Sequence, residues 1–191
     1  VVSTREPQVQ RTSVQQATSV QVAVGNRVIS SSTTQIGTIN RGRDDGPDGG
    51  RNRGDPVAQG FYIDQEDGLF VTSIDVFFSS KSSSLPVTMQ IRTMVNGYPT
   101  QTLIPFGTVT KQAADISTST DASTATTFTF PSPVFVANNT EYSICAIANS
   151  DEFTIYTAKM GQTTLDGTRL ISQQPYLGSM FKSQNSTTWT P

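Results

Sequence analysis

Histidine is absent from this chain of 191 residues. Its absence removes the commonest general base, the usual partner of a nucleophilic side chain and the most frequent zinc ligand. The single cysteine, Cys145, excludes an internal disulfide and lies in the apolar run EYSICAIAN, which is typical of a buried, inert thiol. The sequence offers no constellation of acid, base and nucleophile, so we expect a protein that is not an enzyme and has no cofactor.

Long apolar runs and a strongly basic segment are also missing. No stretch approaches the roughly 20 apolar residues of a membrane-spanning helix, so we expect no membrane insertion. Residues 1–56 carry seven Arg against five acids, and the remainder carries six Lys and Arg against ten acids. Neither part is basic enough to predict a nucleic-acid partner. Because the chain begins with Val, we expect it to be a piece of a longer polypeptide.

Large apolar residues are missing from residues 1–56, which contain no Phe, Tyr, Trp, Leu, Met or Cys. All ten Phe, five Tyr and four Met come later, so we predict a compact domain at 57–191. Residues 41–56, RGRDDGPDGGRNRGDP, have the composition of a flexible linker. Its acids, Asp44, Asp45 and Asp48, lack the further oxygen ligands that calcium needs, so no metal site is expected.

Residues 1–40 are rich in Gln, Ser, Thr and Val, and SVQVAVGNRVISS alternates like a strand around a possible turn at Gly25-Asn26. Such a ribbon has too little apolar area to fold alone. We predict an extended, partly β arm that adds to a sheet edge of another subunit, and a disordered tail is the alternative. The residues predicted to make this contact are Val20, Val22, Val24, Val28 and Ile29.

From residue 57 onward, short stretches alternate between apolar and polar residues, as half-buried strands do. The segment KQAADIS, residues 111–117, predicts one helical turn at most. Eight or more short strands separated by turn residues predict an all-β fold, an antiparallel β-sandwich of jelly-roll type. In LFVTSIDVFFSS the residues expected to share one face are Phe70, Ile74, Val76 and Phe78. In VTMQIRTMVNG they are Val87, Met89, Ile91 and Val95, and a tight turn is expected at Asn96-Gly97.

The next strands continue the pattern. Phe128 and Phe130 are expected side by side, and an Asn138-Asn139 turn is expected between two strands. The second of these, EYSICAIAN, is apolar on both faces, which predicts a central position in its sheet. Acidic clusters at Asp64, Glu66 and Asp67 and at Asp151 and Glu152 are interpreted as polar turns, the second in a hairpin loop, rather than as catalytic acid pairs.

The C-terminal stretch QPYLGSMFKSQNSTTWT predicts a last hairpin, with strands at YLGSMFKS and TTWT. Phe181 and Trp189 would be neighbours across it, and Gly178 would mark a bulge or a close backbone approach. The alternative is an exposed platform for a ligand, formed by Tyr176 and Trp189.

Five strings carry a resemblance to a known family: GDPVAQGFYI, FVTSIDVFFSSKSSSLPVTMQIRTMVNGYPT, TATTFTFPSPVFV, NTEYSICAIANSDEFTIYTAKMG and QPYLGSMFKSQNSTTW. In this order they cover nearly all of residues 54–190. They resemble a domain in large structural proteins of contractile-tailed bacteriophages, notably those that infect marine cyanobacteria. The resemblance implies a building block of the virion, in the tail, baseplate or fibre, and supplies no catalytic residues.

Two functions follow as expectations. The first is a non-enzymatic virion structural protein whose partners are other copies of itself and other phage structural proteins, joined through the arm and the sandwich surface. The alternative is a lectin-like, carbohydrate-binding module that takes a host surface glycan, because jelly-roll sandwiches often carry such sites.

Overall fold

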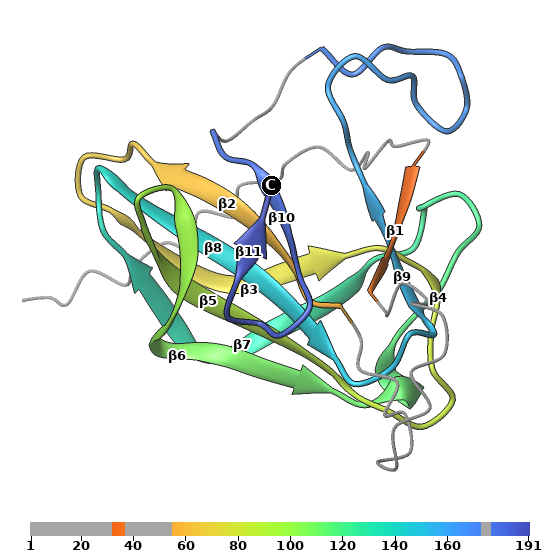
Figure 1. Cartoon of the computed structure of the whole chain (residues 1–191), viewed down its shortest axis with the longest axis horizontal. Coiled ribbons are helices and arrows are strands. Elements are labelled where there is room, and N and C mark those ends of the chain that lie inside the picture. The colour runs from red at the N-terminus through yellow and green to blue at the C-terminus, as the bar shows by residue number, and fades with distance from the viewer. Residues whose placement is uncertain (1–31, 37–54, 173–176) are drawn as a thin grey trace, which may run out of the picture.

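The computed structural model describes residues 32–36, 55–172 and 177–191. Within them the chain is almost entirely β-structure, and every pairing between its eleven strands is antiparallel (Figure 1). The helix described is one 3₁₀ turn, Ala113–Asp115, inside the segment expected to hold a single helical turn. The all-β, antiparallel prediction is therefore confirmed.

The largest sheet has six strands, and β8 lies near its middle with β2 and β5 on either side. The central position predicted for EYSICAIAN is thus confirmed, since this stretch forms most of β8. In spatial order the strands are β11 (Trp189–Thr190), β10 (Met180–Ser183), β2 (Val57–Ile63), β8 (Thr140–Ala148), β5 (Val87–Val95) and β6 (Tyr98–Lys111).

Two smaller sheets complete the fold. One pairs β3 (Leu69–Val76) with β7 (Thr126–Val136), and the other has the order β1 (Ser32–Ile36), β9 (Phe153–Thr157), β4 (Phe78–Ser80). Side chains of β7 pack against those of β2, β5 and β8, so the β3–β7 pair faces the six-stranded sheet. The described chain is therefore a β-sandwich-like arrangement of layers.

Two connections that pass from one sheet to another, β2–β3 and β7–β8, lie against each other. The β2–β3 loop and the β7–β8 turn are joined by hydrogen bonds from the Asn139 amide to the Ile63 carbonyl (2.8 Å) and from Asn138 Nδ2 to the Glu66 carbonyl (3.0 Å). The predicted Asn138-Asn139 turn is confirmed, with Asn139 at a φ of 52°. It joins strands of different sheets, because β7 pairs with β3 and β8 with β2 and β5.

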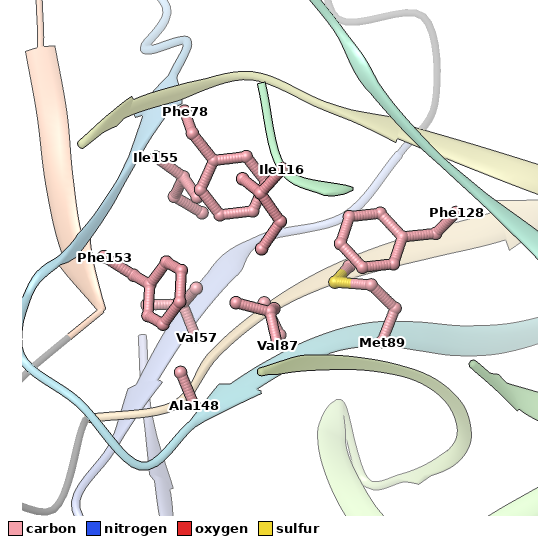
Figure 2. Packing of buried hydrophobic residues seen from close by; sticks show 10 residues of the cluster. Val57, Phe78, Val87, Met89, Ile116, Phe128, Ala148, Phe153 and Ile155 are labelled. Carbon is pink, nitrogen blue, oxygen red and sulfur yellow. The ribbon is translucent and has the colours of Figure 1, made fainter. Parts of the chain in front are cut away.

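One buried cluster connects all three sheets (Figure 2). The ring of Phe78 on β4 lies 6.4 Å from that of Phe128 on β7 and 6.1 Å from that of Phe153 on β9, between ring centroids. Val87 and Met89 of β5 belong to the same cluster. The small β1–β9–β4 sheet is thus fixed to the sandwich by its buried side chains.

The prediction for Phe70 is wrong. Leu69 and Val71 pack against the core, whereas Phe70 is 63% exposed and its ring lies 5.2 Å from that of Phe135, its cross-strand partner. The cause is a shift of register between Val71 and Ser73, which moves the residues before it to the opposite face. Ile74 and Val76, beyond the shift, are partly buried against the core as expected.

In β5, Val87, Met89 and Ile91 are buried, as predicted. The prediction is wrong for Val95, which is 58% exposed. Two register shifts against β6 separate Val95 from the buried part of the strand, and Val95 pairs with Tyr98 at the hairpin tip. The tight turn at Asn96-Gly97 is confirmed by the φ values of 52° and 78° that these residues adopt.

Candidate functional site: the β9 sheet edge

Strand β1 is the described part of the N-terminal segment, and it pairs with β9 through five consecutive residues. The register runs from Ser32 opposite Thr157 to Ile36 opposite Phe153, without a shift. Twenty residues separate Ile36 from the start of β2 at Val57. A segment distant from the sandwich in sequence therefore extends a sheet edge by backbone pairing, which is how a strand from a binding partner adds to a sheet.

The side chains of β9 hold the strand in place from the core side. Phe153 and Ile155 are buried in the cluster that also contains Val57 and Val87, as Figure 2 shows. Tyr156, on the other face of β9, is buried too, and its hydroxyl donates to the carbonyl of Ser119 (2.9 Å). These contacts hold β9 against the core and against the segment that contains Ser119.

The opposite edge of β9 is bound to β4 and the residue before it. The Tyr156 amide donates to the carbonyl of Phe77 (2.9 Å), and Ser80 Oγ donates to the carbonyl of Glu152 (2.8 Å). Backbone groups point alternately to the two sides of a strand. Since Tyr156 faces β4, the backbone groups of Phe153, Ile155 and Thr157 face β1. The edge that receives β1 is therefore continuous from Phe153 to Thr157.

Apart from β1 itself, the other described edges are interrupted. Strand β4 has three residues with a register shift, and β11 has two residues. Strand β6 shifts twice and contains Pro99, Pro105 and a Phe106 with a φ of 63°. Strand β7 contains Pro131 and Pro133 opposite the shift in β3. Bulges, prolines and short length all prevent further strands from pairing, so continuous pairing is concentrated at β9.

The arm residues predicted to contact another subunit lie outside the described residues: Val20, Val22, Val24, Val28 and Ile29. The strand that pairs is β1, STTQI, slightly later in the chain. It contains a single apolar residue, so alternation could not reveal it. The linker acids, Asp44, Asp45 and Asp48, also lie outside the described residues.

The C-terminal hairpin is confirmed, with strands shorter than predicted, and Trp189 is 6% exposed. Trp189 pairs with Ser183 rather than with Phe181, but both rings belong to one small cluster with Ala58 and Cys145. The Trp189 ring thus has no free face for a ligand, and Tyr176, the other platform residue, lies outside the described residues. Gly178 makes the close approach predicted for it, because a Cβ there would lie 2.0 Å from the Gly60 carbonyl oxygen.

The remaining reactive side chains are arranged as structural groups. Cys145 is fully buried, and this burial raises the pKa of its thiol, which disfavours the reactive thiolate. Asp64, Glu66 and Asp67 lie exposed in the β2–β3 loop. Asp151 and Glu152 lie between β8 and β9, which belong to different sheets, so the predicted hairpin loop there is wrong and the segment is a corner.

Metal sites and membrane-spanning helices are both absent from the described part of the chain. No group of three or more acidic, cysteine or histidine side chains there is placed to hold a metal ion. No helix in those residues combines the length and the apolar character required to cross a membrane.

Sequence reasoning missed two features of the structure. The exposed Phe70–Phe135 ring pair follows from the β3 bulge, which alternation does not reveal. Arg92, on the polar side of β5 in the sequence, is buried beneath the β10–β11 turn, where its Nη1 donates to the carbonyl of Ser186 (2.8 Å). Comparisons of the chain with models of protein families, with curated proteins and with solved structures gave no match.

Proposed function

We propose that this protein is a non-enzymatic structural component of a phage virion, in its tail, baseplate or fibre. The sandwich supplies a rigid body, and the N-terminal arm and the sandwich surface connect it to other copies and to other structural proteins of the particle. The sequence resemblance to structural proteins of contractile-tailed phages gives the setting. The β1–β9 ladder is the observation that carries the assembly role.

The finer fold proposal is a jelly roll with an extended arm. Three connections support it: β2–β3, β7–β8 and β8–β9 each pass from one sheet to another, and β2 and β8 are neighbours while β3 and β7 are neighbours. A jelly roll wraps paired strands around two layers in this way. Strand β1 is the described part of the proposed arm.

The assembly role needs an edge that is ready to pair and a strand that can leave it. The β9 edge is held by core packing and by β4, so we expect it to keep its shape without β1. Strand β1 forms one ladder only, whereas β9 forms two. A strand attached by one short ladder contributes little to the fold of the body, and it is well suited to connect one molecule to another.

The test is a pair of substitutions at the end of the ladder. Thr157→Pro removes the backbone N–H that faces β1, whereas Thr157→Ala keeps it. We expect the proline variant to keep its melting temperature within a few degrees and to form assemblies at least tenfold more weakly, measured by sedimentation velocity. The alanine variant should assemble like the unmodified chain.

Deleting residues 1–40 should have the same effect, with a folded body and weakened assembly. If both the proline variant and the truncated chain assemble as well as the full chain, the proposed role of the arm is wrong. The alternative function, a glycan-binding module on Tyr176 and Trp189, lacks comparable support because the Trp189 ring is buried.

A further inference from the structure

We propose that β1 is exchanged between copies of this chain, so that Ser32–Ile36 of one copy pairs with β9 of the next. This inference rests on the proposed assembly function and specifies its partner, which is a second copy of the same chain. It also specifies the contact: the antiparallel register in which Ser32 lies opposite Thr157 and Ile36 opposite Phe153.

The ladder itself has the same energy whether the strand comes from its own chain or from a neighbour. Five residues of β1 pair with β9 through backbone groups, and the sequence STTQI offers one apolar side chain. The acceptor edge is fixed by residues outside β1, namely Phe153, Ile155 and Tyr156 with their core and β4 contacts. Exchange therefore replaces each contact with an identical one, the condition under which domain swapping costs little.

The connection to β2 is long enough for exchange. Twenty residues lie between Ile36 and Val57, and five of the sixteen residues in 41–56 are glycine. Fully extended, twenty residues reach at most about 70 Å, and a glycine-rich chain of this length has a root-mean-square span of about 25 Å. About 25 Å is comparable to the diameter of a small domain, so the β9 edge of an adjacent copy lies within ordinary reach.

Assembly decides between the two pairings. For an isolated molecule the connector keeps its own β1 near its own β9 at a millimolar effective concentration. Copies packed around a symmetry axis present a second β9 at a similar effective concentration. A strand passed head-to-tail from each copy to the next then closes a ring in which every β9 edge is filled. Because the described edges other than β1 are interrupted, β9 is the edge at which this exchange gives a continuous ladder.

The test uses two full-length variants, each with one added cysteine. Gln35 and Thr154 are register partners, and Thr154 faces β4 with its backbone, so the two Cα atoms form a non-hydrogen-bonded pair, the closer kind. Gln35→Cys and Thr154→Cys are mixed, allowed to assemble, and oxidised mildly. Cys145 is fully buried and does not interfere. A disulfide between the two variants forms only if β1 pairs with β9 of another copy.

In an equal mixture a Gln35→Cys strand meets a Thr154→Cys neighbour about half of the time, so we expect up to about half of the assembled chains to run as a covalent dimer on a non-reducing gel. Gln35→Cys mixed with Glu66→Cys, an exposed residue of the β2–β3 loop, is the control and should give only traces. The double variant, with both cysteines in one chain, reports pairing within the molecule. The inference is overturned if the double variant forms only an internal disulfide and the mixture gives no more dimer than the control.

These outcomes are separate from those of the Thr157 substitutions. If Thr157→Pro weakens assembly while the disulfide is internal, the proposed function stands and the exchange is wrong. If Thr157→Pro and the chain without residues 1–40 both assemble normally, the proposed role of the arm fails whichever disulfide forms. If neither the mixture nor the double variant forms a disulfide, the inferred β1–β9 exchange is also overturned.

Discussion

Arg92 shows how one buried cation can fix a distant segment. The residue is 7% exposed, and its guanidinium donates to Gln90 Oε1 from both Nε (2.9 Å) and Nη2 (2.6 Å). Its Nη1 donates to the carbonyl of Ser186, 94 residues later in the chain. Ser186 adopts a φ of 59°, which an L-residue takes only when its surroundings hold it there. Arg92 therefore anchors the turn between β10 and β11.

Replacing Arg92 should loosen this turn first. Hydrogen bonds to a charged group contribute about 1.5–3 kcal/mol, so Arg92→Met should lower the free energy of unfolding by about 2–3 kcal/mol. Urea unfolding followed by the fluorescence of Trp189, the single tryptophan, measures the change. Arg92→Lys, which keeps the charge but not the planar fork, should recover only part of the loss. An unchanged unfolding midpoint in the Met variant would contradict this role.

The position of Arg92 was beyond the reach of sequence reasoning. In VTMQIRTMV it occupies a polar position of an alternating strand, and that alternation correctly placed Met89 and Ile91 inside. Alternation separates the two faces of a strand but does not say whether a second element covers the outer face. Here the C-terminal hairpin covers it, and that contact joins residues far apart in sequence.

At the scale of single elements, the approach of β10 to β2 depends on Gly178. The amide of Gly60 donates to the carbonyl of Ser179 (2.8 Å), and a Cβ at Gly178 would lie 2.0 Å from the carbonyl oxygen of Gly60. The atom in the way is backbone, which cannot move aside as a flexible side chain can. Gly178 thus permits the contact through which the last hairpin joins the six-stranded sheet.

We expect Gly178→Ala to separate β10 from β2 and to lower the free energy of unfolding by about 3 kcal/mol or more, in the range of strongly disruptive substitutions. Gly161→Ala is the matched control, because Gly161 has a φ of 81° but no atom within 4 Å of an added Cβ. That variant should lose only about 1 kcal/mol from backbone strain. Equal losses in the two variants, measured by chemical unfolding, would show that the close approach is unimportant.

The elements also show where a sequence pattern fails. Alternation was reliable within unbroken stretches, as at Val87, Met89 and Ile91, and it failed across a bulge, as at Phe70. Between Val71 and Ser73 the pairing with β7 shifts register, and such a shift can reverse every side chain on one side of it. The β3 sequence gives no sign of the shift at Thr72, because Phe70 and Ile74 fit a regular strand equally well.

At the scale of the whole molecule, the central cluster joins the three sheets through Phe78. Its ring lies between those of Phe128 and Phe153, which come from different sheets. Phe78 is fully buried, so removing the ring leaves a cavity at the junction of the layers. We therefore expect the sheets to lose stability together rather than one at a time.

Phe78→Ala should lower the free energy of unfolding by about 3–5 kcal/mol, with one cooperative transition at a lower temperature. Phe70→Ala is the same substitution on the outer surface, where the ring contacts only Phe135 among the ring pairs described. Its loss should be about 0.5–1.5 kcal/mol. Calorimetry measures the stability loss of each variant. A smaller loss for Phe78→Ala than for Phe70→Ala would disprove the central role of the cluster.

The candidate site illustrates what the sequence could and could not predict. Residue types alone predicted a strand-rich body after residue 57 and an N-terminal segment without a core of its own. They did not indicate that STTQI is the pairing strand, since a ladder built on backbone groups leaves no side-chain pattern. They also placed Asp151 and Glu152 in a hairpin, because sheet membership depends on long-range pairing.

The corner between β8 and β9 has a mechanical consequence. Only four residues separate Ala148 from Phe153, so a pull on β9 passes directly to β8, which is paired on both sides. Tension arriving from residues before Ser32 enters the ladder at Thr157, while the resisting anchor lies at its other end, at Phe153. The five residue pairs are then loaded in shear and must break together, so a fastening of this geometry resists stretching far better than peeling.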